Sequence, residues 1–212
     1  MESSGKKLAD WIEDGCNAVL LNLLWLVCCF PVITIGASTA AMQSVAKRIA
    51  CRESVHVWSQ FWQGFRENWK QGSGVFALSA VFGAACAGDI ALGLYNEGTA
   101  GHVCLFIGIV GLICIAAVWT MAFPLMIRYR TPFGKLLKNA FLLALTNPHI
   151  VLAGIAAAAL FPAIGLVENA RIRMIAIPGF FLLGGVLPAL AVQLLMRRVY
   201  ERLESDTNRE EA

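Results

Sequence analysis

Five long apolar runs constrain this chain more than any other feature of its sequence. The runs cover residues 18–42, 75–94, 103–127, 150–167 and 174–196. A helix needs about 20 apolar residues to cross a bilayer, because each residue adds about 1.5 Å of length. A backbone inside lipid also has to satisfy its own hydrogen bonds, which helices do. We therefore predict an all-α membrane protein with about five transmembrane helices, folded as one membrane domain over residues 1–212.

The overall composition indicates the same class of protein. Hydrophobic residues make up 58% of the 212 residues and charged residues 15%. Soluble domains have about 45–50% apolar and about 25% charged residues. The excess apolar surface predicts the lipid bilayer as a partner. The net charge of +3 is small, and the cations lie at the ends of apolar runs, so the sequence does not predict nucleic-acid binding.

The reactive residue types form no recognisable site. Most of the seven cysteines lie inside apolar runs, where cysteine behaves as a small hydrophobe, and no C-x-x-C pair is present. The sequence also lacks H-E-x-x-H, G-x-S-x-G, G-x-x-x-x-G-K and G-x-G-x-x-G. We predict no catalytic residue, no metal and no cofactor, and we interpret the protein as a non-enzyme.

The first apolar run is interrupted by a proline. Proline removes one backbone donor and clashes with the preceding helical turn, which predicts a kink or a short unwound stretch near residues 30–35. We expect Ser38 or Thr39 to cap the continuing helix. Irregular backbone at membrane depth needs protein or water partners, so the break should face the protein interior. The candidates for this break, or for a small cavity beside it, are Pro31, Thr34, Gly36, Ser38 and Thr39.

A stripe of aromatic residues precedes the second run. Five aromatic side chains recur at helical spacing and form what we call the aromatic face: Trp58, Phe61, Trp62, Phe65 and Trp69. Polar residues stand between them, which predicts an amphipathic helix over residues 56–70. Tryptophan favours the membrane interface, and basic amphipathic helices lie in its plane. Three interpretations stay open for this face: the membrane interface, contact with the protein's own cytoplasmic surface, and docking of a partner.

Two further local patterns complete the expected organisation. The stretch Gly72-Ser-Gly74 is interpreted as the turn that leads into the second run. A second amphipathic helix is predicted over residues 132–146, with Pro132 at its start and Asn147-Pro148 after its end. Both amphipathic helices are expected on the cytoplasmic side, because each adjoins a basic segment.

Positive charge is distributed unevenly between the two sides of the expected membrane domain. The segments that follow the first, third and fifth runs hold 13 of the 17 Lys and Arg residues. Cytoplasmic loops are enriched in these residues, so we predict a cytoplasmic C-terminus and an external N-terminus. One alternative stays open: if Pro31 turns the first run into a re-entrant hairpin, the N-terminus is cytoplasmic as well.

Three stretches of the chain resemble the YesL-like family of bacterial integral membrane proteins. They are NLLW at 22–25 followed by FPVITIGASTA at 30–40, FWQGFRENWKQ at 61–71, and FPLMIR at 123–128 followed by LKNAFLLA at 137–144. The resemblance implies a multi-pass protein of the bacterial cell membrane, in a family of unknown function with no assigned catalytic residues. Genes of that family often lie beside sugar permeases and carbohydrate-degrading enzymes, which implies an accessory role in carbohydrate uptake.

Two functions are therefore expected, in different classes. The first is a non-catalytic accessory factor associated with carbohydrate uptake, which docks on a sugar permease through the aromatic face. The second is a small-molecule transporter or channel built around the broken first helix. The second function predicts a polar cavity near Gly36, Ser38 and Thr39.

Overall fold

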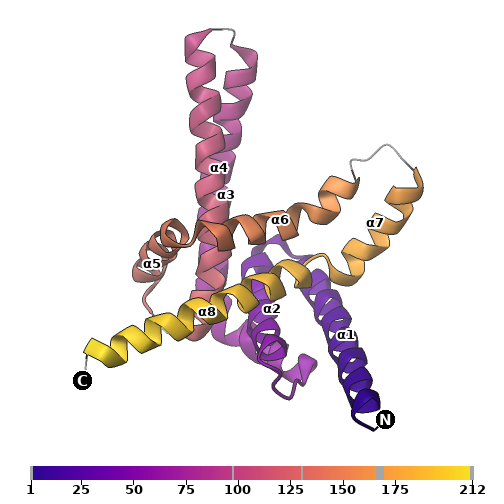
Figure 1. Cartoon of the computed structure of the whole chain (residues 1–212). Helices are drawn as coiled ribbons and strands as arrows, with labels where there is room; N and C mark the ends of the chain where they lie inside the picture. Colours follow the sequence, from indigo (N-terminus) through magenta and orange to yellow (C-terminus); the bar gives the residue numbers. More distant parts are fainter. Residues whose placement is uncertain (1, 97, 130, 166–169, 211–212) are drawn as a thin grey trace.

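The computed structural model describes residues 2–96, 98–129, 131–165 and 170–210, and these residues form helices and short connections without a strand (Figure 1). The predicted all-α fold is confirmed. The elements are α1 (Glu2–Cys29), the short 3-10 helix η1 (Val32–Thr34), α2 (Ile35–Ala50), α3 (Val57–Tyr95), α4 (Thr99–Arg128), α5 (Phe133–Thr146), α6 (Pro148–Gly165), α7 (Ala170–Leu183) and α8 (Val186–Glu210).

Three to five segments among the described residues are long and apolar enough to cross a membrane. Ile12–Cys29 of α1, the helix α3 and the helix α4 each meet that requirement alone. Two bent pairs meet it together: α5 with α6, bent by 97°, and α7 with α8, bent by 49°. The predicted number of five corresponds to counting each bent pair as one span. The end of the expected fourth span, at residues 166 and 167, lies outside the described residues.

The first apolar run folds into a hairpin of two helices. α1 ends at Cys29, and α2 begins at Ile35 and returns along α1, so the N-terminus and the α2–α3 connection lie at the same end of the molecule (Figure 1). Ala18 and Leu21 of α1 pack in one cluster with Val45 of α2 and its neighbours, as expected for two antiparallel helices. Residues 18–42 therefore do not form a single rod.

The second apolar run and the amphipathic helix before it form one continuous helix. α3 extends over 39 residues, from Val57 to Tyr95, and the turn predicted at Gly72-Ser-Gly74 is absent. Gly72 and Gly74 instead allow neighbouring parts of the protein to pack closely against α3. A Cβ atom on Gly72 would lie 2.7 Å from the carbonyl oxygen of Gly36, and one on Gly74 would lie 3.1 Å from the ring of Phe133. No proline interrupts this stretch, so the helix continues into the second run.

Two clusters of buried side chains hold the helices together. One lies where α4 meets α5, α6 and α8, and it includes Met121, Phe123 and Met196. The other lies between α1, α2, the start of α3 and the start of α8, and it includes Leu21 and Phe61. Beyond these clusters the α3–α4 hairpin projects away from the body (Figure 1). Its outer part exposes large apolar side chains on several sides, which suits contact with lipid.

Candidate functional site

The fold divides the aromatic face at the start of α3 into buried and exposed parts. Phe61 is completely buried, whereas 62% of Trp58 and 39% of Trp69 are exposed. Trp62 and Phe65 are half-buried, and their ring centroids are 5.5 Å apart. The five rings therefore do not form one exposed stripe. Phe61 anchors α3 to the rest of the protein, and the indoles of Trp58 and Trp69 are available at the two ends of the face.

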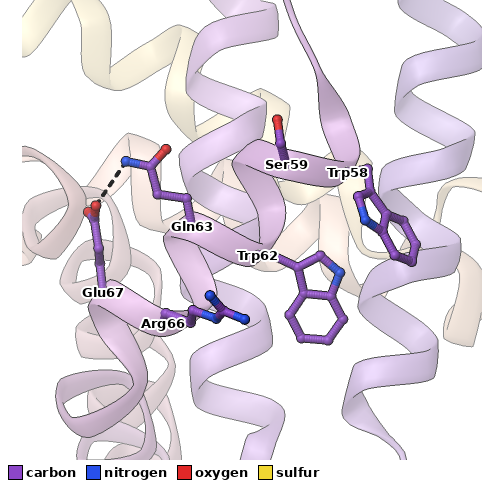
Figure 2. A pocket seen from close by; sticks show the side chains of 6 residues that line it. All are labelled: Trp58, Ser59, Trp62, Gln63, Arg66 and Glu67. Atoms are coloured by element: carbon purple, nitrogen blue, oxygen red, sulfur yellow. Dashed lines mark hydrogen bonds between the residues drawn. The ribbon is translucent and has the colours of Figure 1, made fainter.

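A surface groove of about 780 Å³ follows the exposed side of this segment. Figure 2 shows the side chains that line it, and they stand in two adjacent rows. Within each row the residues follow one another at intervals of about one helical turn: Trp58, Trp62 and Arg66 in one row, and Ser59, Gln63 and Glu67 in the other. Gln63 donates a hydrogen bond of 2.9 Å to Glu67, which orders the second row. The groove thus offers two indoles and a guanidinium along one edge, and polar oxygens along the other.

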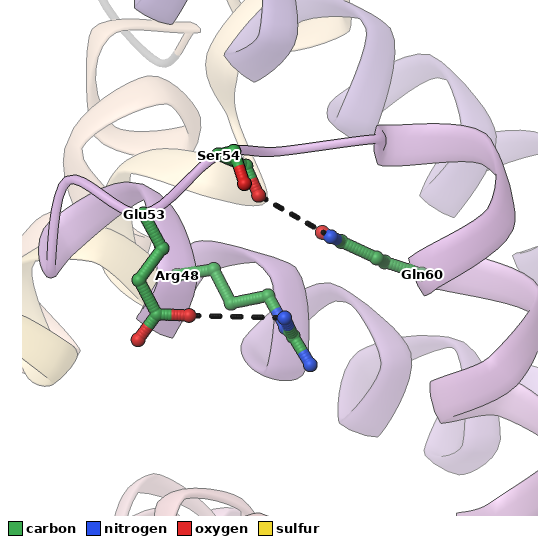
Figure 3. Close-up of polar contacts among 4 residues, drawn as sticks. All are labelled: Arg48, Glu53, Ser54 and Gln60. Atoms are coloured by element: carbon green, nitrogen blue, oxygen red, sulfur yellow. Dashed lines mark hydrogen bonds and ion pairs between the residues drawn. The ribbon is translucent and has the colours of Figure 1, made fainter.

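The connection between α2 and α3 sets the position at which this groove begins. Arg48 and Glu53 form an ion pair of 3.7 Å, and the Gln60 amide donates to the Ser54 carbonyl oxygen at 3.4 Å (Figure 3). Arg52 has a φ of 55°, so the chain turns sharply there. Both members of the ion pair are about half-exposed, and such a pair contributes at most about 1 kcal/mol.

The break in the first run lies where the sequence predicts it, and side chains complete its hydrogen bonds. α1 ends just after Cys28, so the Cys28 carbonyl oxygen lacks a helical donor. The hydroxyls of Thr34 and Ser38 both donate to this oxygen, the latter at 3.0 Å. The cap expected at Ser38 or Thr39 is wrong, because α2 begins at Ile35 and both hydroxyls donate to carbonyl oxygens earlier in the chain.

The break faces the protein interior only in part. Thr34 is buried, but Phe30, Val32 and Ile33 are 92%, 62% and 71% exposed. This differs from the expectation that the whole break is enclosed. The physical reason is that the hydroxyls of Thr34 and Ser38 satisfy the freed carbonyl oxygen from the inner side, so the apolar side chains can face outward. Pro31 is exposed and precedes η1 with a φ of −76°.

Gly36 lies at a close crossing of α2 over α3. A Cβ atom at Gly36 would collide with the backbone of Gly72, and Ser38 is completely buried. The polar cavity expected near Gly36, Ser38 and Thr39 is therefore not found at the first two residues. Thr39 is different, because it borders a cavity of about 240 Å³ that lies among α1, α2, α4, α6, α7 and α8.

That cavity lies beside a second helix break, which Asn22 holds in place. α7 ends at Leu183, α8 begins at Val186, and the glycines between them line the cavity. Asn22 is completely buried. Its amide nitrogen donates to the Phe181 carbonyl oxygen at 2.8 Å, and its amide oxygen accepts from the backbone nitrogens of Gly185 and Val186 at 2.8 and 3.1 Å. One side chain of α1 thus satisfies backbone groups on both sides of the break.

A pair of buried amides crosses from α2 to α8 near the same cavity. The Gln193 amide nitrogen donates to the Gln43 amide oxygen at 2.8 Å, and the two side chains are 5% and 7% exposed. Gln43 lines the cavity, together with Trp25, Thr39 and Thr120. Charged residues are absent from the described lining of this cavity.

Sequence reasoning missed Asn22, Gln43 and Gln193 as site residues. Each is an uncharged amide inside an apolar stretch, and this signal was available in the sequence. A buried amide in a membrane segment has to find a partner, because lipid offers none. The distances between these residues along the chain are long, so their partners could be found only from the fold.

The remaining titratable groups do not gather into a site in the described part of the chain. No three of its His, Cys, Asp and Glu residues lie close enough together to hold a metal ion. All seven cysteines are free. Asp89 is partly buried near the outer end of α3.

The fold therefore defines a class: an all-helical protein with apolar helices long enough to span a membrane, two helix breaks and no strand in its described residues. Residues 18–90 match the family model described as "Protein of unknown function, DUF624". The matched segment covers the second half of α1, all of α2 and most of α3. No curated protein and no solved structure matches the chain.

Proposed function

We propose that this chain is a multi-pass protein of the bacterial cell membrane, of the YesL-like type, that acts as a non-catalytic accessory factor in carbohydrate uptake. In this proposal it docks on a sugar permease through the groove lined by Trp58, Trp62 and Arg66 on the cytoplasmic side of the membrane. The observation that carries the proposal is the groove itself, which combines the exposed indole of Trp58 and the half-buried indole of Trp62 with a guanidinium, on a helix that continues into the membrane.

The chemistry of the groove supports a protein partner. Trp and Arg are enriched among the residues that contribute most to protein–protein affinity. Phe61 fixes this segment of α3 in the core, so its exposed side chains need little ordering when a partner binds. The family match also covers this segment of α3.

Co-purification with sugar permeases tests this proposal directly. The tagged protein is co-expressed with each candidate permease from a bacterium that encodes both, extracted in mild detergent, and compared with the variants Trp58→Ala and Trp62→Ala. We expect one permease to co-purify with the unaltered protein. Loss of a central indole contact costs about 2 kcal/mol, so each variant should reduce the apparent affinity about 30-fold.

The matched control is Phe106→Ala, which removes an aromatic side chain that is 69% exposed at the far end of the α3–α4 hairpin. This variant should co-purify as the unaltered protein does. Recovery of a permease in equal amounts with all three variants would contradict docking at the groove. Failure of every permease to co-purify would contradict the accessory function.

A small-molecule transporter is the second candidate function, and the cavity between the two helix breaks favours it. Transporters often bind substrates where helices are discontinuous. The close crossing of Gly36 and Gly72 counts against a path along the first break, because backbone fills that space. Flux of a labelled monosaccharide into proteoliposomes that contain only this chain would support transport, and its absence would favour the accessory function.

A further inference from the structure

The cavity between the two helix breaks has the properties of a small binding site. Its volume of about 240 Å³ corresponds to about eight water molecules at roughly 30 Å³ each. Pockets for drug-sized ligands start near 300 Å³, so this cavity suits a smaller molecule. Three polar side chains line it, Thr39, Gln43 and Thr120, and they come from two different helices.

Gln43 presents an unused hydrogen-bond donor to this cavity. Its amide oxygen accepts from Gln193, and no described residue accepts from its amide nitrogen. The side chain is only 7% exposed and lines the cavity. The cavity is where an acceptor for this donor has room to lie.

Thr120 offers the cavity a hydrogen-bond acceptor. Its hydroxyl donates to the Ala116 carbonyl oxygen at 2.8 Å, which leaves the lone pairs of the hydroxyl oxygen available to a ligand donor. Thr39 has less hydrogen-bonding capacity left for a ligand, because its hydroxyl donates to the Ile35 carbonyl oxygen and accepts from the Trp25 indole. The ligand therefore needs an acceptor for Gln43 and a donor for Thr120.

The rest of the lining disfavours a charged ligand and favours a ligand with C–H groups on its surface. Four aromatic rings border the cavity: Trp25, Trp119, Phe123 and Phe180. No acidic, basic or histidine side chain is found in the described lining, so an ion would lose its hydration without a counter-charge. Hydroxyl groups combine a donor and an acceptor without charge, and a polyol carries them on a C–H frame.

We propose that this cavity binds a small uncharged polyol, up to the size of a monosaccharide, whose hydroxyl groups accept from the amide of Gln43 and donate to the hydroxyl of Thr120. The site uses α4, α6, α7 and α8 as well as α1 and α2. It is separate from the groove on α3, so binding here and docking there are independent proposals.

Ligand titrations of the full chain in phospholipid nanodiscs test this proposal, because sugar-headed detergents are then absent. Glucose, glucosamine and gluconate have similar sizes and are respectively neutral, cationic and anionic near neutral pH. Tryptophan fluorescence reports binding, since Trp25 and Trp119 line the cavity. We expect a saturable change with glucose and at least a tenfold weaker response with the two charged compounds.

Two variants locate the response in the cavity. Gln43→Leu combined with Gln193→Leu removes the donor without leaving one amide unpaired, and it should weaken glucose binding about tenfold. Ala158→Leu places a larger side chain in the cavity lining and should abolish binding. Ala159→Leu, on the same helix but outside the lining, should bind glucose normally.

Several outcomes would overturn the proposal. Absence of any glucose response in the folded chain is one, and equal responses to all three compounds is another. A glucose response that persists in Ala158→Leu would place the binding elsewhere. If octane alters the fluorescence of the unaltered chain and glucose does not, the cavity holds an acyl chain and the polyol assignment is wrong.

Discussion

The side chain of Asn22 connects α1 to the break between α7 and α8 through hydrogen bonds. An amide has two donor hydrogens and an oxygen with two lone pairs. Asn22 uses both ends: its nitrogen contacts the carbonyl oxygens of Phe180 and Phe181, and its oxygen accepts from Gly185 and Val186. A helix break inside apolar surroundings would otherwise leave these groups unsatisfied. The break between α7 and α8 is therefore stable because α1 supplies the missing partner.

Replacing this amide should be costly. Asn22→Ala leaves at least two backbone nitrogens without an acceptor, and each unsatisfied group costs about 1–3 kcal/mol. We expect the free energy of unfolding, measured in mixed micelles, to fall by about 2–4 kcal/mol. Asn96→Ala is the control, since Asn96 is exposed and bonds only to its own helix. It should change stability by less than about 0.5 kcal/mol. Equal effects of the two variants would contradict this role of Asn22.

The helices show which features of the sequence were sufficient for prediction. The apolar runs predicted helices, and Pro31 predicted the first break, because length and proline act locally. The turn at Gly72-Ser-Gly74 was predicted wrongly, since a glycine that allows close helix packing and a glycine in a turn look alike in sequence. The break at Gly184 and Gly185 was not predicted, because its stability depends on Asn22, which lies far away along the chain.

Alanine substitutions at two glycines of α3 are expected to have opposite effects on stability. Gly72→Ala places a Cβ atom 2.7 Å from the Gly36 carbonyl oxygen, so α2 and α3 have to separate. Overpacking of this kind costs about 1–3 kcal/mol of stability. Gly83→Ala meets nothing within 4 Å and should stabilise α3 by about 0.5–1 kcal/mol.

Thermal unfolding of both glycine variants in nanodiscs measures this difference. The midpoint should fall for Gly72→Ala and rise or stay unchanged for Gly83→Ala. A stabilising effect of Gly72→Ala would mean that the two helices do not cross closely, and that Gly72 has no packing role.

The chain as a whole exposes more surface than a compact soluble protein. Its accessible surface is 13362 Å², whereas a soluble monomer of this mass has roughly 9,600 Å². The projecting α3–α4 hairpin contributes to this surface, since large apolar side chains such as Phe82, Phe106 and Ile113 are more than half exposed on it. Lipid around this hairpin would cover those side chains without any further protein.

The hairpin of α1 and α2 changes the expected position of the N-terminus. An external N-terminus follows if residues 18–42 cross the membrane once, but the chain reverses between α1 and α2 (Figure 1). Lys6 and Lys7 then lie at the same end as Lys47 and Arg48. Only Arg171 and Arg173 are left for the opposite side, so the positive-inside asymmetry becomes stronger. We therefore propose the alternative left open by Pro31, a cytoplasmic N-terminus.

Cysteine labelling on intact cells distinguishes the two topologies. In a background without the seven native cysteines, Ser4→Cys, Ser54→Cys and Thr99→Cys are exposed to a membrane-impermeant maleimide. Thr99 begins α4 at the end of the projecting hairpin, so we expect labelling of Thr99→Cys in intact cells. Ser54→Cys and Ser4→Cys should react only after the membrane is permeabilised, because both positions lie at the basic end of the molecule. Labelling of Ser4→Cys in intact cells, with Ser54→Cys still protected, would show that α1 crosses the membrane alone and that the α1–α2 hairpin does not form there.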